Sequence, residues 1–237
     1  MVAVVAARSG RYTQDVFQSL ANSEQQLIES LTGRSLSLPP NRLLVDKGEV
    51  GVVLYRIISG WAYRFRNGGE GCRHILDFLM PGELVGLQAA LLGVLDHSVR
   101  SLTPLQVSTI DARLVGEAFR SEPNLAMRLA RHAAAEASRV DELLTVIGCS
   151  DAVGRIAYLM LSLYHRQAAR AEIDPRACPF PLRRQHLADT LGLTGAHINR
   201  TLNRLREEGI AQIDNQHLSI LDLPRLTELA GSATPPR

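Results

Sequence analysis

The sequence has few of the residues that stabilise small disulfide-rich or metal-binding proteins. Its 237 residues include only three cysteines, Cys72, Cys149 and Cys178, and these stand far apart. An odd number of isolated cysteines supplies neither a disulfide framework nor a C-x-x-C metal site. A reducing compartment is therefore the simplest interpretation, and we expect no metal site.

Long hydrophobic runs are also missing. The opening MVAVVAA is too short for the core of a signal peptide, lacks a basic start, and is followed by Arg8 rather than by a cleavage site. No run approaches the roughly 20 apolar residues that cross a bilayer. We expect the protein to stay in the cytoplasm, with no membrane partner.

Motifs that carry catalysis are absent as well. Metal-dependent oxygenases of the cupin type, which use a β-roll, need two histidines one residue apart, and this chain has no His-x-His. No Ser-His-Asp arrangement, glycine-rich phosphate loop or pair of catalytic carboxylates stands out either. We expect the protein not to be an enzyme.

Charge of one sign does not dominate the chain. Apolar residues make up 46% and charged residues 21%, which is ordinary for a globular protein, and the net charge is only +2. Between residues 176 and 206, however, the basic residues face a single acid, Asp189: Arg176, Arg183, Arg184, Arg200, Arg204 and Arg206. Glu207 and Glu208 then reduce this excess. The result is a modest basic patch that suits phosphates.

The most informative stretch is residues 183–210, RRQHLADTLGLTGAHINRTLNRLREEGI. Gly192 predicts the end of one short helix, and Thr194 has the side-chain oxygen of an N-cap for the next. Apolar residues recur at helical spacing in both helices: Leu187, Ala188 and Leu191, then Ile198, Leu202 and Leu205. This pattern predicts a helix-turn-helix, whose second helix enters the DNA major groove. The alternative is an ordinary helical hairpin.

The residues after this motif predict a β-hairpin. Gly209 ends the second helix, and two short strands, at 210–213 and 217–220, flank the turn signal Asp214-Asn215. A strand pair directly after a recognition helix is a wing. The C-terminal residues 224–230 predict one more short helix.

An all-β unit precedes these elements. Between residues 42 and 110 the chain shows short apolar or alternating runs separated by glycine-bearing turns: LLV, VVLYRII, WAYRFR, HILDFL and LQVSTI. Residues 11–30 ahead of this unit predict a leading helix.

Residues 121–149 predict the longest helix, which Ser121-Glu122-Pro123 starts and Gly148 stops. Ser150 or Asp151 then caps the next helix. An apolar seam recurs at intervals of four and three: Ala126, Ala130, Ala133, Ala137, Val140, Leu144 and Ile147. Leu125, Leu129 and Leu143 flank the seam, and four charged residues are left for solvent: Arg128, Arg131, Arg139 and Glu142. This spacing predicts pairing with a second copy of the chain, and a plain buried helix is the alternative.

Together with the PGELVG and VGRIAYLML stretches, these elements resemble the cyclic-AMP receptor/fumarate-nitrate regulator (Crp/Fnr) family over nearly the whole chain. The resemblance implies an α+β fold: a jelly-roll-like β-roll sensor domain at 1–120, a central dimerisation helix at 121–149, and a winged helix-turn-helix at 150–237. It also implies a transcription regulator that binds a palindromic DNA site as a homodimer and contacts RNA polymerase. The alternative is a ligand-binding or protein-interaction module that does not bind DNA.

The resemblance also implies which residues contact DNA. Arg200 occupies the position of the family's base-contacting arginine, so we expect a bidentate contact to guanine. His197, Asn199 and Gly195 lie on the same helix as further base-reading candidates. Four residues are expected to hold phosphates: Arg184, Gln185, Thr194 and Arg204.

The PGELVG stretch resembles the approach to the phosphate-binding turn of the nucleotide-binding relatives. It implies an effector pocket near Gly86, Leu87, Gln88, His97 and Ser98. In those relatives a glutamate follows the glycine, and an arginine before the serine or threonine holds the cyclic phosphate. Leucine cannot accept a ribose hydrogen bond, and imidazole lacks the bidentate fork of guanidinium. These departures argue against a cyclic nucleotide and leave an unidentified small-molecule effector.

Other members of the family bind an iron–sulfur cluster or haem. Iron–sulfur relatives use several cysteines near the N-terminus, whereas the first cysteine here is Cys72, which argues against a cluster. Cys72, His74 and His97 are conceivable haem ligands. Packing or surface roles are the alternative, because Cys72 and His74 share one face of a strand pattern. Residues 148–151 are the expected hinge between the sensor and DNA-binding parts. Cys149 in this hinge suggests a redox switch, but no neighbouring residue supports one.

Overall fold

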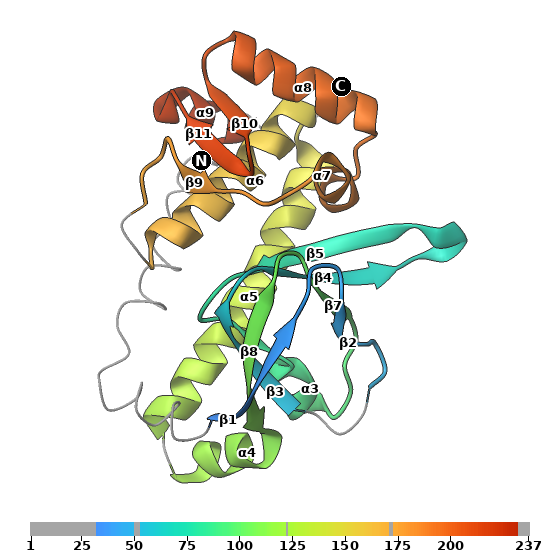
Figure 1. Ribbon diagram of the computed structural model, residues 1–237, viewed down its shortest axis with the longest axis vertical. Helices are drawn as coiled ribbons and strands as arrows, with labels where there is room; N and C mark the ends of the chain where they lie inside the picture. Colours follow the sequence, from blue (N-terminus) through green and yellow to red (C-terminus); the bar gives the residue numbers. More distant parts are fainter. Residues whose placement is uncertain (1–31, 50–52, 122, 171–172, 232–237) are drawn as a thin grey trace. The chain divides into compact units, whose positions relative to one another are not determined.

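The computed structural model describes residues 32–49, 53–121, 123–170 and 173–231 (Figure 1). Within these residues the chain forms two compact units, 32–137 and 138–231. The predicted leading helix at 11–30 lies outside the described residues. None of the helices described here is both long and apolar enough to cross a membrane.

The first unit is built on two four-stranded antiparallel sheets. One sheet has the order β1 (Thr32–Leu38), β8 (Leu105–Asp111), β3 (Val53–Ser59), β6 (Leu84–Val85). The other has the order β2 (Leu43–Val45), β7 (Ser98–Ser101), β4 (Ala62–Asn67), β5 (Arg73–Leu79). The predicted all-β unit is confirmed, and each predicted run forms a strand. Strand β1, which precedes the predicted unit, and the short strands β6 and β7 had not been predicted.

Alternation along the strands places the core between the sheets. In β8, Leu105 and Val107 are buried whereas Gln106 is exposed, which is the period of two that a strand imposes. Three short helices complete the unit: the 3-10 turn η1 (Gly69–Gly71), α3 (Leu87–Leu92) and α4 (Ala112–Ser121). The buried core joins residues of both sheets: Val45, Ile57, Ala62, Leu79, Val85, Val99, Leu105 and Val107.

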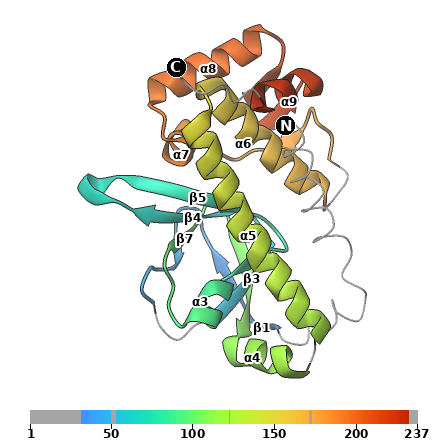
Figure 2. The same cartoon turned by 180° about the vertical axis from the view of Figure 1, so that it is seen from behind.

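Helix α5 (Pro123–Cys149) is the longest element, and the boundary between the units falls inside it (Figure 2). Its N-terminal part packs on the β-roll, because Leu125 and Leu129 join a second buried cluster with Leu54, Leu87 and Ile110. Two predictions are wrong. Gly148 does not stop the helix, which continues to Cys149, and Arg139 is buried with 9% exposure rather than left for solvent.

The second unit is the predicted winged helix-turn-helix. It contains α6 (Ala152–Ala168), β9 (Cys178–Pro179), α7 (Arg184–Leu191), α8 (Gly195–Glu207), β10 (Ala211–Asp214), β11 (His217–Ile220) and α9 (Leu223–Gly231). Asp151 is the N-cap of α6, and its Oδ1 accepts a hydrogen bond of 2.8 Å from Gly154 N. Strand β9 adds a third strand to the wing, in the order β10-β11-β9. Strand β9 has only two residues, and one of them is a proline, so the signal in the sequence was too weak to predict this strand.

The wing turn lies one residue later than predicted. Asn215 and Gln216, not Asp214 and Asn215, have positive φ angles of 47° and 63°. Positive φ at both central residues is the geometry of a two-residue type I′ hairpin, whose twist matches the strands.

Gly60, in the turn between β3 and β4, gives a test of this packing. Its φ is +84°, and an added Cβ would lie 2.0 Å from the carbonyl oxygen of Pro104. Gly48 has a φ of +86° with nothing within 4 Å of an added Cβ, so it is a matched control. Both substitutions to alanine carry the strain of positive φ, but only Gly60→Ala adds the clash. We expect Gly60→Ala to lower the free energy of unfolding by about 1–3 kcal/mol more than Gly48→Ala, measured by urea denaturation. Equal losses would contradict this packing.

Candidate nucleic-acid interface

The turn of the helix-turn-helix forms as the sequence predicts. Gly192 ends α7 with a φ of 62°, a left-handed conformation that glycine adopts without strain. Thr194 begins α8, and its Oγ1 accepts a hydrogen bond of 3.3 Å from His197 N. Both ends of the turn are therefore fixed by local interactions.

Helix α8 has one face in the core and one in solvent. Ile198 and Leu205 are fully buried, and Leu202 is half-buried. Thr201 is also buried at 6% exposure, which the apolar pattern did not indicate. The other residues from 195 to 207 are exposed, so the helix presents a continuous polar surface.

All four base-reading candidates lie on this exposed surface. Arg200 has no ion pair with any acid among the described residues, so its guanidinium is available to a ligand. The His197 ring is held near the cap, with Nδ1 3.1 Å from Thr194 Oγ1. A Cβ added to Gly195 would meet no atom within 4 Å, so packing in this unit does not require glycine there.

The four phosphate candidates differ in availability. Arg184 is exposed at the start of α7, with no acidic partner in the described part of the chain. The Gln185 side chain donates to Asp189 Oδ1 at 2.6 Å, and Arg204 Nε donates to Glu208 Oε1 at 2.6 Å. The Thr194 hydroxyl caps α8. Only Arg184 can therefore take a phosphate without giving up an existing partner.

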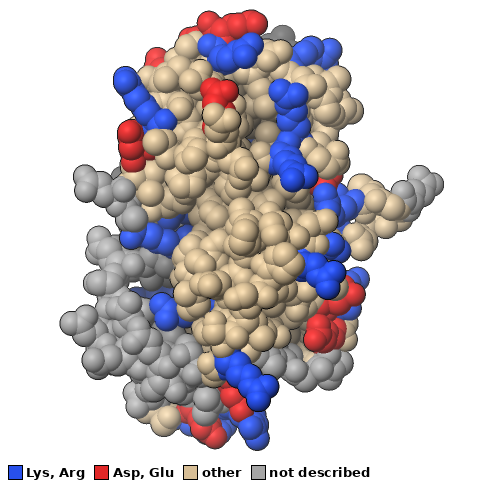
Figure 3. All heavy atoms as spheres, viewed as in Figure 1, with Lys and Arg blue, Asp and Glu red and all other residues tan. Residues whose placement is uncertain are grey.

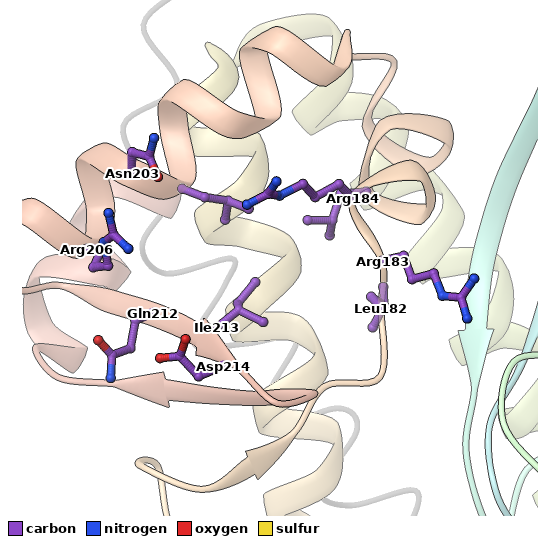
Figure 4. A pocket seen from close by; sticks show the side chains of 10 residues that line it. Leu182, Arg183, Arg184, Asn203, Arg206, Gln212, Ile213 and Asp214 are labelled. Atoms are coloured by element: carbon purple, nitrogen blue, oxygen red, sulfur yellow. The ribbon is translucent and has the colours of Figure 1, made fainter.

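Charge on the molecule is mixed. On the face shown in Figure 3, basic and acidic side chains are interspersed between large uncharged areas. The excess of basic residues between residues 176 and 206 is therefore a feature of that segment and not of the whole molecule. A pocket beside α7 and α8 adds Arg183, Asn203, Arg206 and Gln212, which the sequence analysis had not singled out beyond the general basic patch (Figure 4).

The polar residues of the predicted effector pocket have hydrogen-bond partners within the first unit. Gly86, with a φ of 91°, starts α3, and Leu87 is 2% exposed in the core and offers no polar group. Gln88 Nε2 lies 3.4 Å from Asp96 Oδ2, and His97 Nδ1 lies 2.6 Å from Asp96 Oδ1. The Ser98 hydroxyl donates to Asp46 Oδ1 at 2.6 Å. Each polar candidate is therefore bound to a carboxylate of the unit itself.

Arg64, which the sequence analysis had not singled out, is the most deeply buried cation of this region, with 6% exposure. Its Nη2 lies 3.6 Å from Asp77 Oδ2 on the neighbouring strand, and Nη1 contacts Glu136 Oε1 of α5. Its Nε and Nη2 make no hydrogen bond with any of the described residues. Burial, together with the Arg64 charge, lowers the pKa of His97, so a neutral imidazole is favoured there.

No group of three or more His, Cys, Asp or Glu side chains in the described ranges is arranged to hold a metal ion. Of the conceivable haem ligands, Cys72 is exposed, His74 is half-buried and His97 is buried against Asp96. Cys149 is exposed. Cys178, the first residue of β9, is buried, and burial raises the pKa of its thiol to about 11, which makes it unreactive.

Two domain models match the chain. The Crp-like helix-turn-helix domain matches residues 154–229, and the cyclic nucleotide-binding domain matches residues 35–122. Together they account for most of the two units described above.

Whole-length relatives agree with these matches. The nitrogen fixation regulation protein FixK of Bradyrhizobium diazoefficiens is 26% identical over 220 residues, which cover 93% of this chain and 91% of that protein. The anaerobic regulatory protein of Pasteurella multocida is 26% identical over 212 residues, which cover 89% of this chain and 77% of that protein.

A solved structure shows the same fold. FixK2 from Bradyrhizobium japonicum superposes with a TM-score of 0.75 at 20% identity, covering 83% of this chain and 96% of that chain. The β-roll with its following long helix, the winged helix-turn-helix with its exposed α8, and the aligned relatives all lead to one assignment. The chain belongs to the Crp/Fnr family of DNA-binding transcription regulators.

Proposed function

We propose that the protein works as a homodimer that binds a two-fold symmetric DNA site through α8, with a small-molecule or redox input at the β-roll. The observation that carries this proposal is Arg200, an exposed arginine without an acidic partner among the described residues, on a capped recognition helix. Arg200 donates to O6 and N7 of a guanine. His197 and Asn199 contact neighbouring bases, and Gly195 lets the backbone approach them.

The seam of α5 supports pairing of two chains. Three of its members are exposed, Ala130, Ala137 and Leu144, and Leu144 retains 68% exposure. Ala133, Val140 and Ile147 are half-buried along the same line. A leucine this exposed in a regular helix is a contact surface when its neighbours at spacings of three and four are apolar. Pairing would present two α8 helices to half-sites about 34 Å apart.

The β-roll residues support an input that differs from a cyclic nucleotide. Leu87 is part of the core, and the Ser98 hydroxyl already donates to Asp46, so neither offers a ligand a free polar group. Arg64 connects β4 to Glu136 of α5. A ligand or redox event that alters this ion pair acts on α5, which extends to the DNA-binding unit. We propose neither an iron–sulfur cluster nor haem, and we propose that the regulator acts on RNA polymerase in the cytoplasm, where the DNA is.

The first test separates base reading from phosphate contact. Random duplex DNA is selected with the purified protein at two salt concentrations, and the enriched site is then used to compare variants. We expect enrichment of a two-fold symmetric sequence. Arg200→Ala should flatten base preference and cost roughly 1–3 kcal/mol per contacted guanine, whereas Arg204→Ala should weaken all duplexes alike. Equal, sequence-independent losses from both variants would contradict the assignment. No salt-dependent binding to any duplex would favour a module that does not use DNA.

The second test concerns the α5 seam. Leu144→Glu places a carboxylate where two chains meet, and we expect the dimer to weaken by at least about a hundredfold because the charge is desolvated. Sedimentation equilibrium measures this change. Thr145→Glu, an exposed position beside the seam, is the matched control and should leave the dimer unchanged. A Leu144→Glu protein that still dimerises like the wild type would rule out this seam as the interface.

The third test concerns His97. Its folded-state pKa lies below the ordinary value of about 6.5, so the unfolded chain takes up a proton first on acidification. The stability contribution of neutral His97 is present above about pH 6.5 and is lost as the pH falls toward the folded pKa. We expect the wild type to lose more unfolding free energy between pH 7.5 and 5.5 than His97→Gln, measured by urea denaturation. His165→Gln is the comparison, because burial also lowers the pKa of His165. Identical pH profiles for wild type and His97→Gln would contradict the buried, neutral state of His97.

A further inference from the structure

Arg155, near the start of α6, joins the end of α5 to the end of α7. Its Nε donates a hydrogen bond of 2.9 Å to the carbonyl oxygen of Ser150, and its Nη1 donates one of 3.1 Å to the carbonyl oxygen of Leu191. Arg155 and Leu191 are 36 positions apart in the sequence. One guanidinium therefore connects two helix ends that no local pattern brings together.

Both acceptors are carbonyls at the end of a helix. Leu191 is the last residue of α7. Ser150 continues the hydrogen-bond pattern of α5, because its N–H donates to the carbonyl oxygen of Val146 at 3.0 Å. The last four carbonyls of an α-helix have no partner within the helix, and their partial negative charge attracts a cation. The half-buried Arg155 therefore supplies two helix ends with a donor and a positive charge.

The end of α5 is bound to α6 by further contacts. The Tyr158 hydroxyl of α6 donates to Glu142 Oε2 of α5 at 3.0 Å. Leu143 and Val146 of α5 are buried, with 7% and 9% exposure. Residues 138–149 accordingly belong to the same compact unit as α6, α7 and α8. The expected hinge at residues 148–151 is therefore spanned by side-chain contacts.

Leu191 leads directly into the recognition helix. Gly192 and Thr194 form the turn, and α8 begins at Gly195. A bond to the Leu191 carbonyl thus holds the backbone just before the N-terminal end of α8, which is the end that reads bases in a helix-turn-helix. The position of α8 relative to the end of α5 therefore depends on Arg155.

The same part of α5 carries Leu144, which belongs to the seam proposed to join two chains. We infer that Arg155 is a positioning residue that sets the spacing of the two DNA half-sites, because it holds each α8 in a fixed orientation to the end of the paired helices. The inference rests on the proposed function, since it needs the dimer and its two-fold symmetric site. It adds a determinant of half-site spacing that contacts no base.

This role requires the shape of arginine as well as its charge. The N–H donors of a guanidinium lie in a rigid planar fork, so Nε and Nη1 of Arg155 reach the two carbonyls together. Lysine carries the same charge on a single nitrogen at the end of a flexible chain. Arg155→Lys therefore keeps a cation at the helix ends but loosens the connection between them. Arg155→Gln removes the charge as well and serves as a second variant.

The experiment compares two duplexes that differ only in the spacing of their half-sites. One is the symmetric site selected by the wild type. The other has one extra base pair between the half-sites, which displaces one half-site by about 3.4 Å and rotates it by about 35°. We expect the extra base pair to weaken wild-type binding about a hundredfold or more, because the two half-sites can no longer be engaged together, and Arg155→Lys only about tenfold or less. Fluorescence anisotropy measures this spacing ratio for each protein.

Base preference separates positioning from a loss of stability. We expect Arg155→Lys and Arg155→Gln to discriminate against a mismatched base pair within a half-site as the wild type does. A DNA-binding unit that is merely destabilised would bind both duplexes more weakly by the same factor, so its spacing ratio would stay at the wild-type value. Arg225→Ala, which removes a surface ion pair with Glu228 in α9, is the matched control and should keep the wild-type ratio. Circular dichroism and sedimentation equilibrium verify that each variant is folded and dimeric.

The outcomes separate this inference from the proposed function. If the wild type selects no symmetric duplex, the proposed function fails and the inference fails with it. If the wild type selects one, the proposed function stands and the spacing ratio decides. A smaller ratio with unchanged base preference in each variant that folds supports the positioning role of Arg155. A wild type that tolerates the extra base pair, variants that keep the wild-type ratio, or a failure of both variants to fold would overturn it.

Discussion

The periodicity of a single helix is the constraint on which the rest of the structure depends. Helix α5 buries Leu125 and Leu129 against the β-roll on one face and leaves Ala130, Ala137 and Leu144 exposed on another. An α-helix keeps these faces apart over its whole length, because its hydrogen bonds fix the angle between successive residues. One rigid element can therefore hold the sensor unit and offer a surface to a second chain. The Arg64–Glu136 ion pair adds a polar connection to the same helix.

Burial of Arg64 restricts how the β-roll can respond to a signal. A cation at 6% exposure needs its carboxylates, because an unpaired buried charge is costly. Asp77 and Glu136 meet this need only in part, since two nitrogens of Arg64 make no hydrogen bond within the part of the chain that the structure describes. Nearby, Asp96 is already bound to His97, with Oδ1 2.6 Å from Nδ1 of the imidazole. Any input at this site has to compete with existing contacts.

On the DNA-binding unit, ion pairing decides which arginines are available. Arg204 is on the same helix as Arg200, yet it is paired with Glu208 at a spacing of four residues. Arg200, Arg184 and Arg206 have no such acid among the described residues. The number of basic residues in the segment is therefore a poor guide to phosphate binding. Whether each arginine already has an acidic partner is the better guide.

Much of the fold could be predicted because local patterns dictate it. Gly192 and Thr194 define the turn of the helix-turn-helix through backbone conformation and capping, and the structure confirms both. The alternating runs of the β-roll and the spacing along α5 likewise depend only on residues close in sequence. Where local signals were weak or conflicting, the prediction failed: Gly148 is within α5, and the wing turn is shifted to Asn215 and Gln216.

By itself, the sequence determined the order of the main elements, but not strands β1, β6, β7 and β9. It also determined the capped recognition helix and the exposed position of Arg200. Only the tertiary structure decided that Leu87 is core, that Gln88 and His97 converge on Asp96, and that Arg184 and Arg206 line one pocket. Arg184 and Arg206 belong to different helices, separated by 22 positions, and Arg64 lies 72 positions from Glu136. Such neighbours are brought together by packing of whole elements. No pattern of period two or 3.6 carries that information, because it describes the faces of one element and not which faces meet.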